Sequence, residues 1–573
     1  MANGMGTLYI ASSGLRNSQN ALNTTANNLA NVDTEGYVRQ QVLFSDKEYN
    51  TFGTAAVSKQ QAGLGLDIGD VVHARDYFLD KAYRAESGRQ AFYESCFTAV
   101  DEIQTYFQEM EGKTFQSALE DFKKAFQKLA KDPSDSVRQN LVVQKAGLFL
   151  SRSQSVYEGL KSYQSNINTK VSQDIDKINK LGHKIHELNQ QISKIEAGGI
   201  ETAMDLRDER DLALDQLGAL AKISYKEDYK GVVTVKLEDE YFVDELHTYE
   251  IGKKTDKLTG FITPYWPQLS DTDRDIYVNV FDFNVDISTA LNSDVGELKA
   301  LIMSRGDHWA DYSDIEGKGE QEYLDTTNLS VIIDMQAKLD QMVHNMITAI
   351  NDQLCPNVTG PVGVTYQDAN GNTVNLSDAK VLDTENCARG SDGELPPREL
   401  FVRAGIERYT EVTGSDGKTY YVYNEEDTSD TSYMYSLTSC GVNEELKKIE
   451  TLFPHLKQNG EVDQQLGERL EALWNKDLVG LDPTDPDECN IEEYYQKMIG
   501  GLATVGNVYQ KKAENLAGSV LTIENNRQQV IGVSSDEELQ NMIKFQNAYN
   551  ASSRFMTVIS DMIEHIVTRL GNG

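Results

Sequence analysis

Both ends of this 573-residue chain carry apolar residues at alternating spacings of three and four, the pattern of a coiled-coil helix. Near the N-terminus, small or polar residues fill every second position, so a helix there would bury little alone and needs a partner. The C-terminal pattern is more apolar and follows the helix-start signal Ser534–Asp536. The positions expected to form an assembly interface are Leu8, Leu15, Leu22 and Leu29 at one end and Met542, Phe545, Tyr549, Met556, Ile559, Ile563, Ile566 and Leu570 at the other.

The N-terminal pattern breaks just after Leu29, in a stretch of turn-forming residues. Asn31 and Asp33 have short side chains that hydrogen-bond to nearby backbone, and Gly36 permits a positive φ. We therefore expect Asn31, Asp33 and Gly36 to turn the chain out of the first helix.

The interior begins with a long helical region. Asp132–Asp135 interrupts it, with Ser134 or Asp135 as the N-cap of the next helix. The segment Ile178–Ile195 repeats the three-four spacing, and Gly198-Gly199 ends it. A second amphipathic segment at 203–220 is expected to fold back as a helical hairpin.

The pattern then changes to strands. Ser224–Leu237 alternates apolar and polar residues around a Lys230-Gly231 turn, as a β-hairpin does. Helix returns at Leu329–Leu354, and a second β-like stretch follows, with turns at Asn370-Gly371 and Asp416-Gly417.

These patterns predict an α+β, multidomain protein. N- and C-terminal coiled-coil helices would enclose a discontinuous α-helical bundle with two inserted β-rich domains. The expected parts are end segments 1–60 and 534–573, bundle parts 61–221, 326–355 and 491–533, and inserts 222–325 and 356–490.

The charge balance narrows the classes of partner. Lys and Arg number 54 against 90 Asp and Glu, so the net charge is −36, which disfavours nucleic acid and anionic lipid. No apolar run approaches the length of a membrane span, and the N-terminus lacks the basic and apolar regions of a signal peptide. The sequence predicts a cytosolic protein or one exported without a cleaved signal.

Candidate chemistry is weak. The five cysteines are far apart and form no CxxC pair, so neither a disulfide framework nor a zinc knuckle is indicated. His183 and His186 share a helix face, and Asp271–Asp275 begins like a calcium loop, but position six is Ile276 instead of glycine. We expect no enzyme, no cofactor and no metal site.

The segment from Ala11 to Tyr37 ends in ANNLANVDTEGY. It resembles the N-terminal signature of the bacterial flagellar rod, hook and hook-associated proteins. GLGLDI from Gly63, RDYFLD from Arg75, LRDERD from Leu206 and ELQNMIKFQNAY from Glu538 are similar to segments of this family's hook-associated junction members.

The resemblance implies a structural component of the flagellum that forms the hook–filament junction ring and is required for filament assembly. In this family the end helices pack as a coiled coil in an inner tube, and neighbouring subunits complete their burial. Implied partners are further copies of the chain, the hook protein, the second hook–filament junction protein and a flagellar export chaperone. Nucleic acid and membrane insertion are not expected. The implied location is the extracellular flagellum, reached by type III export without a cleaved signal.

Two alternatives remain open from the sequence. The chain could be a hook or distal-rod axial protein, although its long helical region argues against a mostly β hook protein. It could also be an axial scaffold with an enzymatic insert at 222–325 or 356–490, which no nucleophile or metal motif supports.

Overall fold

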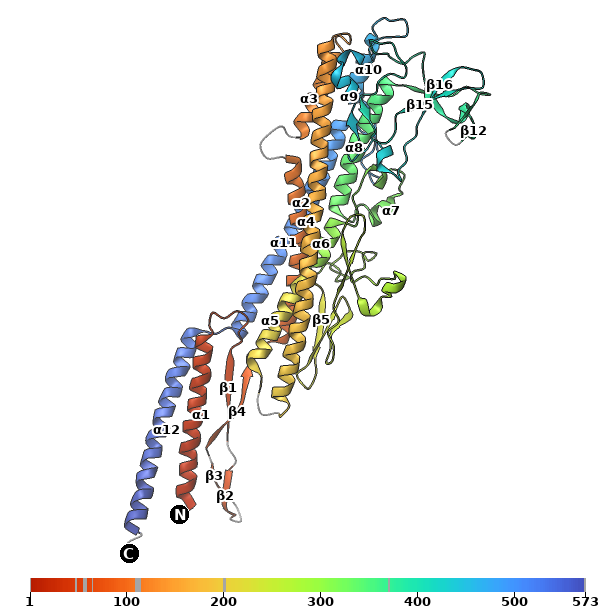
Figure 1. Ribbon diagram of the computed structural model, residues 1–573. Helices are drawn as coiled ribbons and strands as arrows, with labels where there is room; N and C mark the ends of the chain where they lie inside the picture. The colour runs from red at the N-terminus through yellow and green to blue at the C-terminus, as the bar shows by residue number, and fades with distance from the viewer. Residues whose placement is uncertain are drawn as a thin grey trace.

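The computed structural model describes residues 2–46, 49–54, 59–63, 65–108, 115–198, 202–368 and 371–570. The protein is elongated, as Figure 1 shows: the two chain ends form one tip, a helical bundle forms the middle, and the β10–β17 region lies at the far tip. The fold is mixed, with long helices and several small antiparallel sheets.

The tip at the chain ends consists of two helices and a narrow strand layer. Helices α1 (Ala2–Ala30) and α12 (Ser535–Leu570) pack side by side. Next to α1, β1 pairs antiparallel with β4 so that Gln40 lies opposite His73, and β2 pairs with β3. The strands are β1 (Gln40–Asp46), β2 (Tyr49–Thr54), β3 (Lys59–Gly63) and β4 (Leu66–His73). The boundary expected between residues 60 and 61 is therefore wrong, because β3 crosses it.

The helical bundle is built around one very long helix, α4 (Ser136–Glu196). Asp135 caps it, as the sequence predicts, and accepts a hydrogen bond from the backbone N–H of Val137 at 2.9 Å. Every third or fourth residue of α4 is buried, so one face covers the core along its whole length. The other bundle helices are α2 (Tyr77–Gln108), α3 (Phe115–Leu129), α5 (Met204–Leu220), α8 (Val331–Leu354) and α11 (Ile491–Ile531).

The segment between α5 and α8 is only partly β. The predicted hairpin around Lys230-Gly231 is present, and its strands are joined to a third. The strands are β5 (Ile223–Glu227), β6 (Val233–Leu237), β7 (Glu240–Val243), β8 (Gly252–Thr255) and β9 (Ile262–Tyr265). Helices α6 (Glu297–Arg305) and α7 (Glu320–Asp325) follow. The expectation of a β-rich stretch up to residue 325 is wrong beyond Tyr265.

The segment between α8 and α11 consists of short strands, loops and small helices. Its main sheet has the order β10-β13-β16-β15. The strands are β10 (Asn357–Thr359), β11 (Thr365–Gln367), β12 (Thr373–Asn375), β13 (Lys380–Leu382), β14 (Phe401–Val402), β15 (Tyr409–Thr413), β16 (Thr419–Tyr423) and β17 (Gly441–Val442), and the helices are α9 (Glu444–Lys448) and α10 (Gln464–Ala472).

This second segment shares its hydrophobic core with the bundle. Phe401, Leu470 and Trp474 belong to the same buried cluster as the apolar faces of α3, α4 and α8. The Trp474 ring lies 5.7 Å from the ring of Phe122 and 6.2 Å from that of Phe126, both on α3. The division into separate bundle and insert domains stays a prediction, but the packing links the two.

Trp474→Ala is expected to lower the free energy of unfolding of the bundle by about 3–5 kcal/mol, because it leaves a cavity between the segment and α3. Chemical denaturation followed by circular dichroism at 222 nm measures this. Tyr229→Ala, at a side chain that is 93% exposed, is the control. An unchanged helix transition in Trp474→Ala would show that the segment does not support the bundle.

Candidate assembly interface

The end helices contact each other, and small residues line part of that contact. On α1 the buried positions of the predicted repeat are Ala11, Ser18 and Thr25. A Cβ atom on Gly14 would lie 2.8 Å from the Ser552 hydroxyl of α12, so a larger residue there would force that hydroxyl to move. Small side chains bring the two backbones together and leave larger ones at the sides of the pair.

The predicted leucines of α1 flank this contact. Leu8, Leu15, Leu22 and Leu29 are all half-buried, and none is fully covered. The polar positions Ser18 and Thr25 belong to the alternating pattern that was expected to bury little, but they are only 7% and 3% exposed. The leucines therefore keep apolar area that the two helices alone do not cover.

The predicted positions on α12 are covered unevenly. Met542, Tyr549 and Met556 are half-buried, and Ile559 is only 5% exposed. Phe545 is half-buried and meets the ring of Phe44 on β1, with ring centroids 5.9 Å apart. Nearer the C-terminus, Ile563 and Ile566 are exposed, and the Leu570 side chain lies outside the described residues.

A second apolar stripe on α12 was missed. Phe555, Val558 and Met562 are spaced by three and four, and are 44%, 49% and 61% exposed. On a helix these positions lie to one side of the face that meets α1. The same spacing of three and four marks Phe555, Val558 and Met562 in the sequence, beside the more apolar series that was chosen.

The polar character of α1 has a local explanation. Its other face meets the strand layer, where the Asn17 side chain donates to the carbonyl of Leu66 at 2.5 Å. Asn28 donates to the carbonyl of Gln40 at 2.9 Å and accepts from its N–H at 3.1 Å. Asparagine can pair with both groups of an unpaired strand edge, which an apolar residue cannot.

The predicted turn forms where the sequence placed it. Asn31 accepts from the N–H of Thr34 at 3.0 Å through its carbonyl, and its side chain donates back to the carbonyl of Asn27 at 3.0 Å. Gly36 has φ = 80°, and a Cβ there would lie 3.1 Å from Leu212 of α5. Asp33 is exposed within the turn.

Beyond the turn, the chain docks onto α5 and α12. The N–H of Val38 donates to the buried carboxylate of Asp208 at 3.0 Å. Arg39 pairs with Glu538 at 2.8 Å, and its N–H donates to the carbonyl of Ile531 at 2.9 Å. The turn, LRDERD and ELQNMIKFQNAY motifs, distant in sequence, thus meet at one joint.

His73 and Asp208 form a buried acid–base pair in this joint. The Nδ1 atom of His73 lies 3.4 Å from Oδ1 of Asp208. Burial, followed by the charge of Arg75, lowers the pKa of His73 to about 4. Burial raises the pKa of Asp208 to about 7, although the N–H of Val38 favours its charged form. Between about pH 4 and 6.5 the pair holds one proton, on the carboxyl when folded and on the imidazole when unfolded.

His73→Asn is expected to make stability more dependent on pH. In the wild type, the pair binds one proton in both the folded and the unfolded chain between about pH 4 and 6.5. Its contribution to the free energy of unfolding therefore does not change with pH in this range. Without the imidazole, only the raised pKa of Asp208 remains. The protonated Asp208 carboxyl then adds to the free energy of unfolding at low pH. This contribution is lost as pH rises from about 4 to 7, by roughly 1.4 kcal/mol per pH unit.

Denaturant titrations at several pH values test this, with the slope of the variant taken relative to the wild type. The control is His183→Asn, at an exposed histidine that contacts Glu250. A His73→Asn profile parallel to that of the wild type would contradict the assignment.

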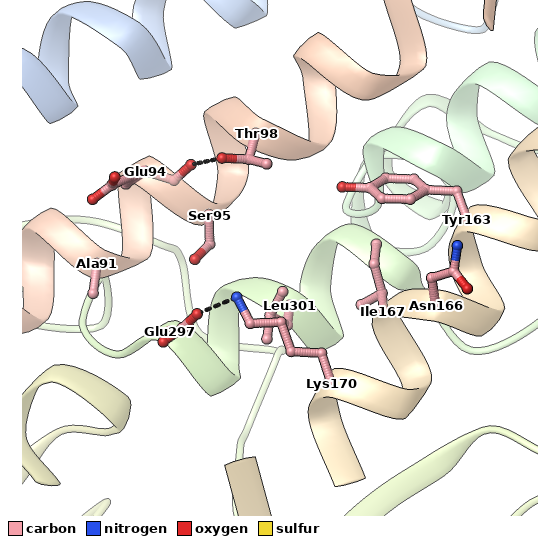
Figure 2. Close-up of a pocket in the computed structure, with 10 residues that line it drawn as sticks. All are labelled: Ala91, Glu94, Ser95, Thr98, Tyr163, Asn166, Ile167, Lys170, Glu297 and Leu301. Atoms are coloured by element: carbon pink, nitrogen blue, oxygen red, sulfur yellow. Dashed lines mark hydrogen bonds and ion pairs between the residues drawn. The ribbon is translucent and has the colours of Figure 1, made fainter. Parts of the chain in front are cut away.

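A pocket of about 460 Å³ lies between α2, α4 and α6. Figure 2 shows the residues that line it. Lys170 of α4 forms an ion pair with Glu297 of α6 at its floor, and the Thr98 hydroxyl donates to the carbonyl of Glu94. The lining residues include no histidine or cysteine.

The histidine pair and the acidic loop that the sequence offered as metal-site candidates each make only local contacts. His183 contacts Glu250, whereas His186 contacts the backbone carbonyl of Asp244. Asp271 caps a short turn by accepting from the N–H of Arg274. Across the described ranges, no three His, Cys, Asp or Glu side chains are grouped to hold a metal. No helix in the part of the chain that the structure describes is long and apolar enough to cross a bilayer.

Three family models match separate parts of the chain. Residues 100–365 match "Flagellar hook-associated protein FlgK helical domain". Residues 8–37 match "Flagella basal body rod protein", and residues 528–569 match "Flagellar basal body rod FlgEFG protein C-terminal". The two rod-protein matches coincide with the paired end helices α1 and α12.

Similar proteins extend along nearly the whole chain. Flagellar hook-associated protein 1 of Bacillus subtilis is 25% identical over 97% of this chain and 96% of its own length. Flagellar hook-associated protein 1 of Salmonella typhimurium is 19% identical over 97% of this chain and 98% of its own length. A solved structure, of the flagellar hook junction protein FlgK from Burkholderia pseudomallei, aligns with 12% identity and a TM-score of 0.48, over 78% of this chain and 100% of that one. By its helical-domain match over residues 100–365 and its relatives along nearly the whole chain, the chain is similar to flagellar hook-associated protein 1.

Proposed function

We propose that this protein is a structural subunit of the bacterial flagellum that forms the ring joining hook and filament and is required for filament assembly. The observation that carries the proposal is the incompletely covered pair of end helices. Phe555, Val558 and Met562 stay exposed after α1 and α12 have paired. Exposed apolar stripes of this kind need neighbouring subunits to cover them.

The proposed partners follow the family. Further copies of the chain would cover the stripes laterally, and the hook protein and the second hook–filament junction protein would contact the ring along the axis. A flagellar export chaperone would bind the chain before export, which proceeds without a cleaved signal. The net charge of −36 disfavours nucleic acid as a partner.

An epitope tag placed at Leu258, an exposed loop residue before β9, is expected to label one band at the distal end of the hook. Immunogold electron microscopy of intact flagella measures its position. Because the loop projects from the surface, the tag should not disturb the end helices. Label along the whole hook would favour the hook-protein alternative, and label within the rod would favour a distal-rod protein.

A further inference from the structure

Six charged side chains form a closed ring where α11 meets the base of the bundle. Three arginines alternate with three aspartates, so each carboxylate lies between two guanidinium groups. In order around the ring they are Arg75, Asp80, Arg527, Asp215, Arg84 and Asp211, which returns to Arg75.

The contacts are short and shielded from water. Arg527 Nε lies 2.6 Å from Asp80 Oδ1, and its second nitrogen lies 2.5 Å from Asp215 Oδ2. Arg84 Nε lies 2.6 Å from the other oxygen of Asp215. Burial acts to raise the pKa of Asp80, but Arg75 and Arg527 hold it below its usual value. With three arginines and three aspartates the ring is electrically balanced, and losing any single member leaves one uncompensated charge.

Five members come from the first 215 residues, and one comes from far along the chain. Arg527 is separated from Asp215 by 312 positions. Without Arg527, two arginines would face three aspartates, and Asp80 and Asp215 would each lose a partner. A buried carboxylate that loses its partner is strongly unfavourable, so the remaining five favour capture of Arg527.

Arg527 lies at the elbow between the bundle and the end helices. It is one turn before Ile531, the last residue of α11, and α12 starts at Ser535. Figure 1 shows α11 arriving there beside the upper end of α1. Together with the joint at Asp208, the ring that holds Arg527 therefore helps to set how α12, and α1 paired with it, leave the bundle.

We propose that this charge ring is a latch that closes when the C-terminal arm docks and fixes the direction of the end helices relative to the bundle. In the closed state Arg527 completes the ring. In the open state the last turns of α11 leave α2 and α5, and the end helices swing free while the rest of the bundle stays folded. This device does not depend on the role proposed for the protein in the flagellum.

Pulsed electron spin resonance on the full chain tests the latch, with spin labels on cysteines introduced at the exposed positions Thr98 of α2 and Gln546 of α12. The wild type is expected to give one narrow distance distribution. Arg527→Gln should raise the opening equilibrium on the order of 100-fold and add a broad second population. Arg554→Gln, at an exposed arginine of α12 without an ion pair to the described residues, should match the wild type.

A second variant separates charge from packing. Arg527→Gln combined with Asp215→Asn leaves two arginines and two aspartates in the ring. The distance distribution of this double variant should therefore be narrower than that of Arg527→Gln alone. A wild-type distribution in Arg527→Gln would overturn the proposal. Equal opening of the single and double variants would overturn it too, as would loss of the bundle's helical signal in Arg527→Gln.

Discussion

A strain that lacks this protein is expected to build hooks that carry no filament and to release flagellin into the medium. The reason is geometric: filament subunits need a matching surface, and the end helices with their exposed stripe would supply it at the hook tip. Electron microscopy of the mutant and immunoblotting of flagellin in the culture supernatant measure the two parts of this result. Restoring the gene should restore filaments, and full-length filaments on the mutant would contradict the proposed function.

Met562→Asp is expected to abolish motility without changing the stability of the isolated protein. The side chain is 61% exposed on α12, so a charge there costs little in the monomer, and the free energy of unfolding should change by less than about 0.5 kcal/mol. Once neighbouring helices cover the stripe, the same charge is buried without a partner and costs several kcal/mol in every subunit. The predicted result is a stable, exported protein that does not join the assembly.

The measurements are thermal unfolding of the purified protein and swimming in soft agar. Gln546→Asp is the matched control, because it places the same charge at an exposed polar position of the same helix. Ile559→Asp provides the contrast, because this side chain is already buried in the end-helix region and its variant should lose stability as well as motility. Normal swimming of Met562→Asp would show that the stripe is not an interface.

Local signals in the sequence predicted local structure well. The cap at Asp135, the turn ending at Gly36 and the hairpin around Lys230-Gly231 each depend on a few adjacent residues, and each is present. The two end helices were expected to need each other, and α1 and α12 do pack together. These features share one property: the residues that determine them are close in sequence or repeat at a fixed spacing.

Features that depend on distant parts of the chain could not be read in the same way. Helix α6 is buried all round, so it lacks the amphipathic pattern by which helices are recognised. Strands β1 and β4 are stabilised by asparagines of α1, whose pairing with strand backbone leaves no periodic signal. The motifs RDYFLD and LRDERD were visible, but only the fold shows that Arg75 and Asp211 meet and that Arg527 joins them through Asp80 and Asp215.

Helix α4 gives the molecule a mechanical property that its packing alone does not reveal. Its 61 residues run without a break, and at 1.5 Å per residue they form a strut of about 90 Å. Because α3, α5 and α8 brace this strut from its sides, bending it would disturb packing along the whole bundle. A load applied at the β10–β17 tip is therefore expected to reach the base of the bundle with little loss to bending.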